Sequence, residues 1–250
     1  MTNDTLTLGG LSCRVVDALP EGRSPEFLVV LCHGFGAPGT DLVPLAPELM
    51  HAAPSVAQAV RFVFPAAPLS LDHMGLFGGR AWWPVEVGAL AAAVERGQLR
   101  DLMDDAPPEL EQARDMLTAA IGQLAAETGL PISRMVLGGF SQGSMLATDV
   151  ALRLEESVAG LCVMSGTLKF ESVWRAQTAR HAKMRVLISH GRQDPIVPFI
   201  GAEWLNNMLV QAGLDVKFIQ FDGGHTIPPE VLTALARLLV ELTSLNEQSK

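Results

Sequence analysis

The chain has 250 residues, a length at the upper end of what one hydrophobic core serves, so we expect a single domain over residues 1–250. Hydrophobic residues make up 48% and charged residues 18%, which excludes a disordered chain, and a net charge of −9 without basic clusters argues against nucleic-acid binding. No apolar stretch is long enough to span a membrane, and the N-terminus lacks the features of a signal peptide. The cysteines lie in apolar runs, which favours buried free thiols in a reducing cytoplasm: Cys13, Cys32 and Cys162.

Short apolar runs alternate with longer helical patterns along the chain. After one or two edge strands within residues 6–19, continuous apolar runs predict strands at 27–32, 60–65, 134–140, 158–166, 184–191 and 216–221. Helical patterns follow Asp41 and Ser141, cover residues 108–129, and begin again at Pro228. This alternation indicates an α/β domain whose mostly parallel central sheet carries helices on both faces.

Residues from about 69 to 105 do not fit this alternation, because the segment is too long for a simple connection. We interpret it as an excursion above the sheet that contains a short helix and lies over the active site. The alternative is a surface elaboration that only packs on the body of the protein. The sequence leaves open whether the excursion moves as a lid.

One serine lies in a context typical of a nucleophile. The stretch GFSQG, residues 139–143, fits the pattern G-x-S-x-G, with a predicted strand before it and a predicted helix after it. In this context the serine backbone is strained, and the hydroxyl points out from the edge of the sheet. The glycines are needed because side chains at their positions would clash with the neighbouring strand and helix. Ser141 is therefore the candidate nucleophile.

A serine hydroxyl needs a base to take its proton, and the base needs an acidic residue that fixes its tautomer and stabilises its charged form. His225 lies in a glycine-rich loop between the last predicted strand and the last helix, at the sheet edge where Ser141 emerges. Asp194 directly follows the preceding strand and is the candidate acid. The resulting chain order, Ser141, Asp194, His225, is the order that the α/β-hydrolase arrangement requires.

The other acids and histidines fit structural roles better. Asp222 competes with Asp194 but suits a turn, while Asp149 lies within a helix and Asp215 begins a strand, so neither should reach the site. The histidines without a catalytic role are His33, which stiffens its loop, His190, a structural hydrogen-bonding residue, and three in surface-like contexts, His51, His73 and His181.

Two backbone N–H groups are expected to bind the oxyanion of the reaction. One is the N–H of Gln142, the residue after the serine. The other comes from the loop HGFG, residues 33–36, that follows an early strand, where Phe35 is the candidate donor. This glycine-rich loop lacks the patterns of dinucleotide and phosphate sites, and no residue spacing suggests a metal ligand set, so we expect no cofactor and no metal.

Five stretches in this order resemble the phospholipase/carboxylesterase family of α/β-hydrolases, which includes acyl-protein thioesterases: LCHGFG, RAWWP, GFSQG, SHGRQDPIVP and GGHTIPPE. The resemblance implies the α/β-hydrolase fold and a cofactor-free serine esterase. It implies the triad Ser141, Asp194 and His225, with the amides of Phe35 and Gln142 as the oxyanion hole. The family usually has leucine in place of Phe35 and an aspartate soon after the aromatic pair, where this chain has residues 84–86 (PVE). These departures surround the acyl-binding wall and affect the choice of substrate.

The densest apolar cluster in a loop context lies in the excursion. It is interpreted either as the lining of an acyl pocket or as an anchor of the excursion to the core. Its members are Met74, Leu76, Phe77, Trp82 and Trp83. Arg80, within the same stretch, is expected to pair with Glu86 rather than to bind a substrate carboxylate.

The leading hypothesis is a serine hydrolase that cleaves carboxylic ester or thioester bonds through an acyl-enzyme intermediate. Its expected partner is a small-molecule or lipid-like acyl ester. The alternative is a catalytically silent protein of the same fold that binds an apolar ligand. The sequence leaves open the natural substrate, the acyl chain length, the preference between ester and thioester, and whether the chain forms a homodimer.

Overall fold

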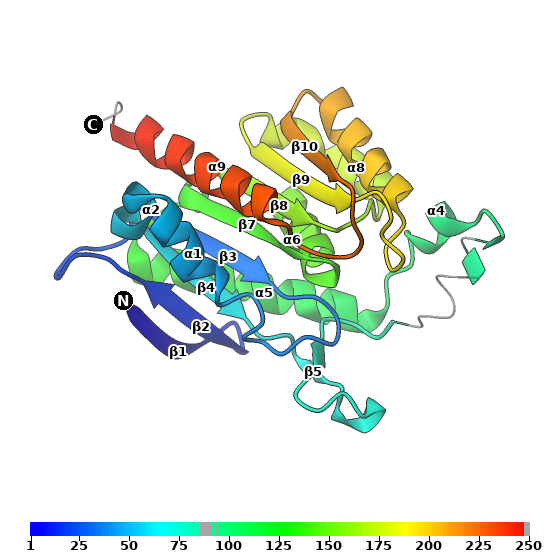
Figure 1. Cartoon of the computed structure of the whole chain (residues 1–250), viewed down its shortest axis with the longest axis horizontal. Helices are drawn as coiled ribbons and strands as arrows, with labels where there is room; N and C mark the ends of the chain where they lie inside the picture. Colours follow the sequence, from blue (N-terminus) through cyan, green and yellow to red (C-terminus); the bar gives the residue numbers. More distant parts are fainter. Residues whose placement is uncertain (86–91, 94, 248–250) are drawn as a thin grey trace.

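The computed structural model describes residues 1–85, 92–93 and 95–247. Within them, one twisted sheet has the strand order β1-β2-β4-β3-β7-β8-β9-β10 (Figure 1). Strands β3 to β10 of this sheet run parallel, while β1 and β2 pair antiparallel at one edge. The strands are β1 Thr2–Leu8, β2 Leu11–Asp17, β3 Phe27–Cys32, β4 Val60–Pro65, β7 Met135–Phe140, β8 Gly160–Met164, β9 Arg185–Gly191 and β10 Asp215–Phe221.

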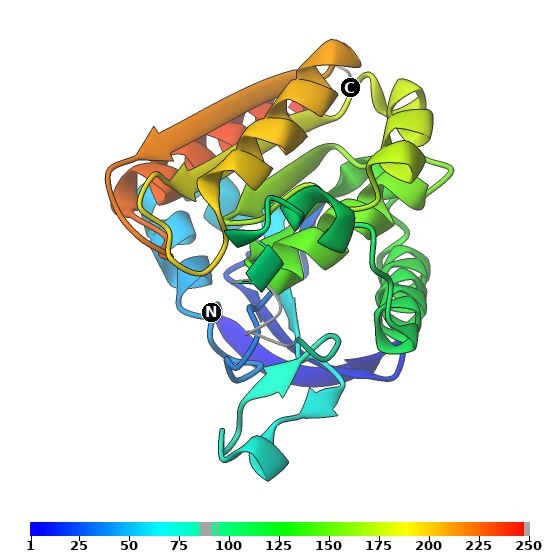
Figure 2. The same ribbon diagram turned by 90° about the vertical axis from the view of Figure 1, so that its right-hand side faces the viewer.

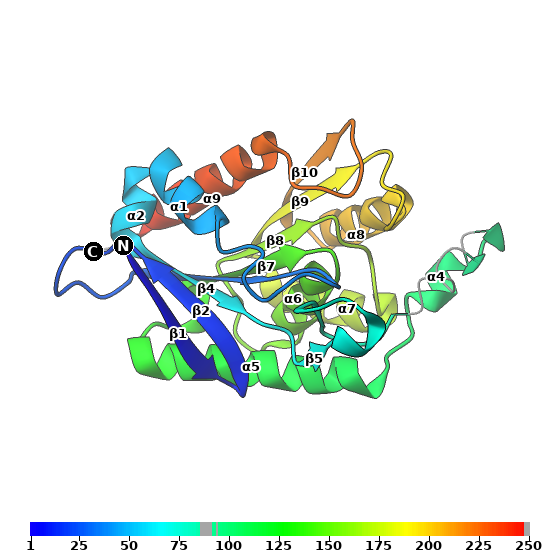
Figure 3. The same ribbon diagram turned by 60° about the horizontal axis from the view of Figure 1, so that its bottom comes forward.

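Helices cover both faces of this sheet, as the alternating pattern predicts. Figure 3 shows α1, α2 and α9 on one side of the sheet and α5 on the other. Each face has its own hydrophobic cluster, one built with α1, α2 and α9 and the other with α5, α6 and α8. The helices are α1 Leu45–Ala52, α2 Pro54–Ala59, α4 Leu99–Leu102, α5 Pro108–Thr128, α6 Gln142–Arg153, α7 Glu171–Gln177, α8 Phe199–Gln211 and α9 Pro229–Glu247.

The six predicted core strands are all present, with bounds within a few residues of those expected. Five of them are almost entirely buried, as parallel strands covered on both faces must be. Strand β10 differs, because it forms the far edge of the sheet and most of its side chains remain partly or fully exposed. The apolar run at 216–221 therefore predicts the strand correctly but not its position at the edge.

The two long predicted helices also match the structure. In α5 the apolar stripe is buried throughout, and the helix ends at Gly129, whose φ of 70° is the left-handed conformation that glycine adopts most readily. Helix α9 starts at Pro229, where a proline costs no helical hydrogen bond. Helices α7 and α8 are additions that the sequence patterns do not predict.

The excursion contains a small hairpin formed by β5 (Leu69–Ser70) and β6 (Arg80–Ala81), with the short 3-10 helix η1 (Asp72–Met74) at its tip. The hairpin projects from the body of the protein, at the bottom of Figure 2. Helix α4 is the short helix expected in the same excursion. Residues 86–91 and 94 of this segment lie outside the described residues. No helix among the described residues is long and apolar enough to cross a membrane.

The parallel strands determine where the candidate site lies. In Figure 1 the arrowheads of β3 and β9 point toward the same rim of the molecule. The segments that follow β3, β7, β9 and β10 contain the loop 33–36, Ser141, Asp194 and His225 respectively. Because the carboxyl ends of parallel strands meet at one edge of a sheet, the fold gathers these segments from distant parts of the chain.

Candidate active site

Ser141 occupies the tight turn between β7 and α6 in a backbone conformation that is rare for a residue with a side chain. Its φ is 52° and its ψ −123°. The turn is held by hydrogen bonds on both sides of the residue: the N–H of Ser141 donates to the carbonyl of Met164 (2.8 Å), and the carbonyl of Ser141 accepts from the N–H of Ser144 (3.0 Å). Such strained residues concentrate at active sites, where the surrounding structure enforces them.

The flanking glycines allow this turn to sit directly against β3. A Cβ on Gly143 would overlap the carbonyl oxygens of Cys32 and His33. A Cβ on Gly139 would also overlap the Cys32 carbonyl oxygen and would lie 2.8 Å from the Gly143 carbonyl carbon. The spacing G-x-S-x-G is therefore a packing requirement of this strand-to-helix turn, as its sequence context predicts.

His225 and Asp194 meet through a hydrogen bond. The Nδ1 of His225 lies 2.7 Å from the Oδ2 of Asp194, so the imidazole donates its Nδ1 proton and leaves Nε2 as the acceptor nitrogen. The other carboxylate oxygen, Oδ1, accepts from the N–H groups of Ile196 (2.8 Å) and Val197 (2.9 Å). The carboxylate is thus fixed in orientation by its own loop.

The charged form of Asp194 is stabilised despite its burial. Burial alone would raise the pKa of this carboxyl, but the hydrogen bonds from His190, His225 and the two backbone N–H groups outweigh it and hold the pKa well below its usual value. A carboxylate that stays ionised near neutral pH at this position can stabilise a positive charge that develops on the imidazole of His225.

His225 also lies next to the serine turn. Its ring packs on Phe140, the residue before Ser141, with 4.6 Å between ring centroids. Within the described part of the chain, the hydroxyl of Ser141 makes no hydrogen bond to this imidazole. Hydrogen bonds of this kind are often loose in unliganded enzymes and tighten when substrate binds.

The other aspartates and histidines considered for the site lie where the sequence suggests, except His181. Asp149 pairs with Arg114 and Arg153 inside the helical layer, and Asp215 pairs with Arg185 at the sheet edge. Asp222 and two of the histidines without a role, His51 and His73, are exposed.

His181 was expected at the surface, and this expectation is wrong. Its ring is fully buried, and its Nε2 lies 3.0 Å from the carbonyl oxygen of Leu152. The neighbouring polar residues suggest an exposed position, but the short 3-10 helix η3 (Thr178–His181) turns this one ring inward.

His190 has the structural role expected for it. It is buried, and its Nε2 donates to the carbonyl of Val197 at 2.8 Å. The same nitrogen lies 3.3 Å from the Oδ2 of Asp194, so two histidines border one carboxylate. The sequence did not indicate this second contact.

The loop 33–36 lies against the serine. A Cβ on Gly34 would be 3.4 Å from the Cβ of Ser141. Gly36, two residues further along, is held in place because its N–H donates to the carbonyl of Arg80 on β6 at 2.9 Å. Phe35, between them, is the candidate oxyanion donor. The second candidate N–H, that of Gln142, belongs to the first residue of α6 and so has no acceptor within the helix.

The side chain of Gln142 binds the tryptophan pair. Its Oε1 accepts from the N–H of Trp82 (2.9 Å), and its Nε2 donates to the carbonyl of Trp83 (2.8 Å). The indole N–H of Trp82 donates to the carbonyl of His33 (2.9 Å). Both tryptophans are buried in the core, so this pair anchors the end of the hairpin segment to the body. The sequence did not indicate these side-chain bonds.

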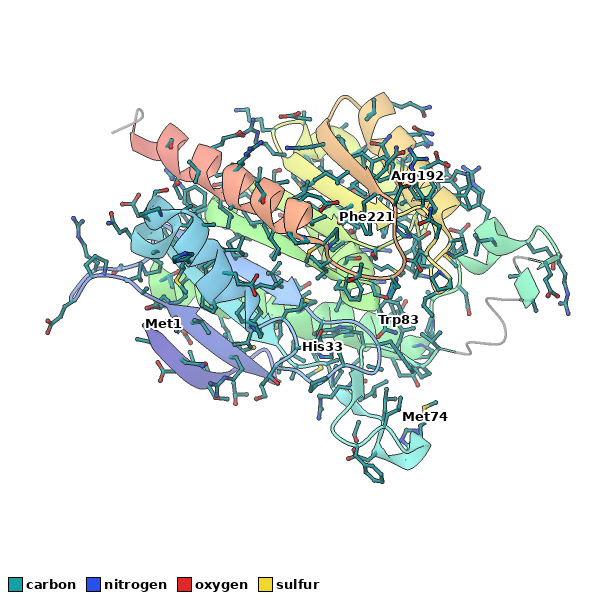
Figure 4. The ribbon with its side chains drawn as sticks, in the orientation of Figure 1. Met1, His33, Met74, Trp83, Arg192 and Phe221 are labelled. Atoms are coloured by element: carbon teal, nitrogen blue, oxygen red, sulfur yellow. The ribbon has the colours of Figure 1, made fainter. Side chains whose placement is uncertain are left out.

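The other members of the apolar cluster lie elsewhere. Met74 and Phe77 are on the projecting hairpin, with exposed fractions of 55% and 88%, and Figure 4 shows Met74 at its tip. The two tryptophans are thus buried, whereas Met74 and Phe77 are exposed. An acyl pocket lined by all four side chains stays a prediction. Arg80 donates to the carbonyls of Ala67 and Pro68. Its expected partner Glu86 lies outside the described residues.

Comparison with known proteins agrees with the fold and with the sequence motifs. A model of the phospholipase/carboxylesterase family matches residues 19–242. Acyl-protein thioesterase 1 of Eremothecium gossypii is 27% identical over 213 residues, covering 83% of this chain and 84% of that protein. A probable carboxylesterase of Oryza sativa subsp. japonica is 30% identical and covers 82% and 83%.

Among solved structures, esterase PE8 superimposes with a TM-score of 0.74 at 30% sequence identity, covering 93% of this chain and 99% of that one. The family match extends from before β3 to near the end of α9 and includes every segment of the candidate site. The chain therefore belongs to the phospholipase/carboxylesterase family, has the α/β-hydrolase fold and is a hydrolase.

Proposed function

We propose that this protein hydrolyses carboxylic esters or thioesters through an acyl-enzyme on Ser141. In this proposal His225 is the general base, and the carboxylate of Asp194 orients the imidazole of His225. The Oγ of Ser141 attacks the carbonyl carbon while its proton passes to Nε2 of His225. That proton then goes to the departing alcohol or thiol. Water, deprotonated by the same nitrogen, cleaves the acyl-enzyme and releases the carboxylic acid.

One observation carries the proposal. His225, from the loop after β10, donates to the buried carboxylate of Asp194 from the loop after β9, and its ring packs on Phe140 beside Ser141. This leaves the acceptor nitrogen of the imidazole available on the side of the ring away from the carboxylate. The strained turn at Ser141 supports the same assignment, because residues held in such conformations cluster at active sites.

The substrate class follows from the chemistry and from the relatives. The N–H groups of Phe35 and Gln142 are proposed to bind the oxygen that becomes negative during attack, which suits any activated acyl carbonyl. The fungal relative is named as a thioesterase and the rice relative as a carboxylesterase. We therefore propose acyl esters or thioesters as substrates. The three free, buried cysteines support a cytoplasmic location.

The first prediction tests the nucleophile. A fluorophosphonate probe should label the native protein, and Ser141→Ala should abolish labelling together with hydrolysis of p-nitrophenyl acetate. The matched control is Ser165→Ala, which removes the hydroxyl of another buried serine with a positive φ, of 51°, outside the proposed triad. This variant should retain labelling. Labelling of Ser141→Ala at the native rate would overturn the assignment.

A second experiment, on the native protein, addresses the alternative of a silent binding protein. Failure of the native protein to hydrolyse p-nitrophenyl esters from acetyl to palmitoyl, together with tight binding of a fatty acid, would favour that alternative. Hydrolysis whose rate changes with acyl length supports the enzyme, because pocket length appears directly as discrimination per methylene.

A further inference from the structure

The imidazole of His33, the first residue of the proposed oxyanion loop, has a defined tautomer. Its ring is buried, its Nε2 accepts from the N–H of Ala67 (3.0 Å), and its Nδ1 lies 2.8 Å from the carbonyl oxygen of Gly34. A backbone N–H can only donate, so Nε2 must be unprotonated and the proton must be on Nδ1. Burial lowers the pKa of this imidazole, which keeps it neutral and preserves this arrangement.

The bond from His33 to Gly34 acts on the next residue through the peptide plane. The carbonyl of Gly34 and the N–H of Phe35 belong to the same rigid, trans peptide unit and point in opposite directions. Fixing the carbonyl oxygen toward the Nδ1–H of His33 therefore fixes the direction of the Phe35 N–H on the other side of the plane. This N–H is the proposed oxyanion donor of the loop.

The second proposed donor is oriented by groups of α6 itself. The N–H of Gln142 shares its peptide unit with the carbonyl of Ser141. That carbonyl accepts from the N–H groups of Ser144 (3.0 Å) and Met145 (3.2 Å) and from the hydroxyl of Ser144 (2.7 Å), all in the first turn of the helix. Thus α6 itself orients one donor, whereas the loop donor needs the imidazole of His33.

The surroundings of His33 hold its own position. The indole N–H of Trp82 donates to the His33 carbonyl (2.9 Å), and the two rings lie 5.5 Å apart between centroids. Figure 4 shows His33 in the loop that leaves β3. Hydrogen bonds therefore hold the backbone carbonyl and both ring nitrogens of His33, and the indole of Trp82 lies beside its ring. With its own position fixed, the imidazole can fix the direction of the Gly34 carbonyl.

We propose that His33 is a positioning residue of the oxyanion hole, which orients the N–H of Phe35 by donating a hydrogen bond to the carbonyl of Gly34. The inference rests on the proposed function, because it assumes that Phe35 binds the oxyanion. It goes beyond stiffening of the loop, because it assigns the effect to one nitrogen of the ring. The bond from Nε2 to Ala67 serves only to set the tautomer.

Two polar substitutions test the roles of Nδ1 and Nε2 of His33 separately. In His33→Asn the amide nitrogen takes the place of Nδ1 and can donate to Gly34, but nothing reaches Ala67. In His33→Gln the longer side chain brings its oxygen to the place of Nε2, accepts from Ala67 and loses the bond to Gly34. We expect His33→Asn to retain kcat within about threefold. His33→Gln should lower kcat at least tenfold, toward the roughly hundredfold lost when an oxyanion donor is deleted, with KM little changed.

The controls use a second buried histidine. His181 is also fully buried with one ring nitrogen bonded to a backbone carbonyl, but it lies outside the proposed site. His181→Asn and His181→Gln should both lower the midpoint of thermal unfolding without changing kcat. Rates are measured with p-nitrophenyl acetate, and the rate of fluorophosphonate labelling provides a second readout, below the unfolding midpoint of each variant.

The outcomes distinguish this inference from the proposed function. A smaller loss of kcat in His33→Gln than in His33→Asn, or equal losses in folded proteins, would refute the positioning role while leaving the triad intact. If instead Ser141→Ala retains labelling, the proposed function fails first. A low kcat in His33→Gln, preserved in His33→Asn, with native KM in both, supports the inference.

Discussion

At the scale of single residues, the strained turn at Ser141 is possible only because the residues two positions before and after it are glycines. A residue in such a conformation costs about 1–3 kcal/mol. The turn persists because Gly139 and Gly143 let β3 and α6 approach within backbone contact. The two glycines thus remove the steric overlap that side chains at their positions would add to the cost of the turn.

We predict that Gly143→Ala destabilises the fold by about 2 kcal/mol or more, because the added Cβ overlaps two carbonyl oxygens that belong to the main chain and cannot rotate away. The same change should slow fluorophosphonate labelling, since α6 must move away from β3. Urea denaturation measures the first effect.

The control for this change is another glycine-to-alanine substitution. Gly122 is an exposed glycine inside α5 with open space where a Cβ would be added. Gly122→Ala should stabilise the protein by up to about 1 kcal/mol, because alanine favours the helix more than glycine does. Equal and small effects at the two positions would contradict the steric argument.

At the scale of elements, α6 is tied to its neighbours by one buried carboxylate. Asp149 of α6 accepts from Arg114 of α5, from Arg153 one turn along α6, and from the indole N–H of Trp174 of α7 (2.7 Å). Its side chain is almost inaccessible to solvent. The helix that begins at the proposed nucleophile is therefore fixed to two other helices by a single charge.

Asp149→Asn should lower the free energy of unfolding by about 3 kcal/mol, because it leaves the mostly buried guanidinium of Arg114 without a counter-charge. This value is at the lower end for breaking a buried pair, since a third of the Arg153 side chain is exposed. Asp215→Asn breaks an exposed pair with Arg185 and should cost less than about 1 kcal/mol. Denaturant midpoints of the two variants decide the comparison, and similar losses would count against the role of Asp149.

The elements that the sequence predicts well are those with an unambiguous apolar pattern. Strands β3, β4, β7, β8 and β9 are continuous hydrophobic runs because both faces are covered, and α5 has a regular stripe. Helix α8 is harder to detect. Small residues such as Gly201 and Ala202 lie on its buried face, while Ile200 and Val210 are exposed, so hydrophobicity does not mark the inward side.

At the scale of the whole molecule, the sequence indicates which residues to propose for the site but not the contacts that each of them makes. The chain order Ser141, Asp194, His225 follows from the motifs and the strand pattern. The second histidine at Asp194 depends on the local turn after β9, and the bonds from Gln142 to the tryptophans depend on how the excursion packs against α6. Hydrophobic periodicity carries no information about either arrangement, so these contacts of the site are seen only in the structure.

The buried imidazoles also affect the stability of the whole fold. Burial lowers the pKa of His181, and the nearby charge of Arg180 acts in the same direction. In the unfolded chain this imidazole titrates near its ordinary value of about 6.5. The folded state therefore binds fewer protons than the unfolded state below that pH, so its contribution to stability is complete above about pH 6.5 and declines as the pH falls toward the folded pKa.

His181→Gln should make the fold less sensitive to mild acid, because glutamine can still donate to the carbonyl of Leu152 but does not titrate. Between pH 6.5 and 5 the unfolding free energy of the native protein should decline more steeply than that of the variant, by up to about 1.4 kcal/mol per pH unit. Urea denaturation of both proteins at half-unit intervals of pH measures this difference. Parallel curves would show that the buried ring takes up no proton on unfolding and would contradict the assignment of a neutral His181, whereas curves that converge toward acid support it.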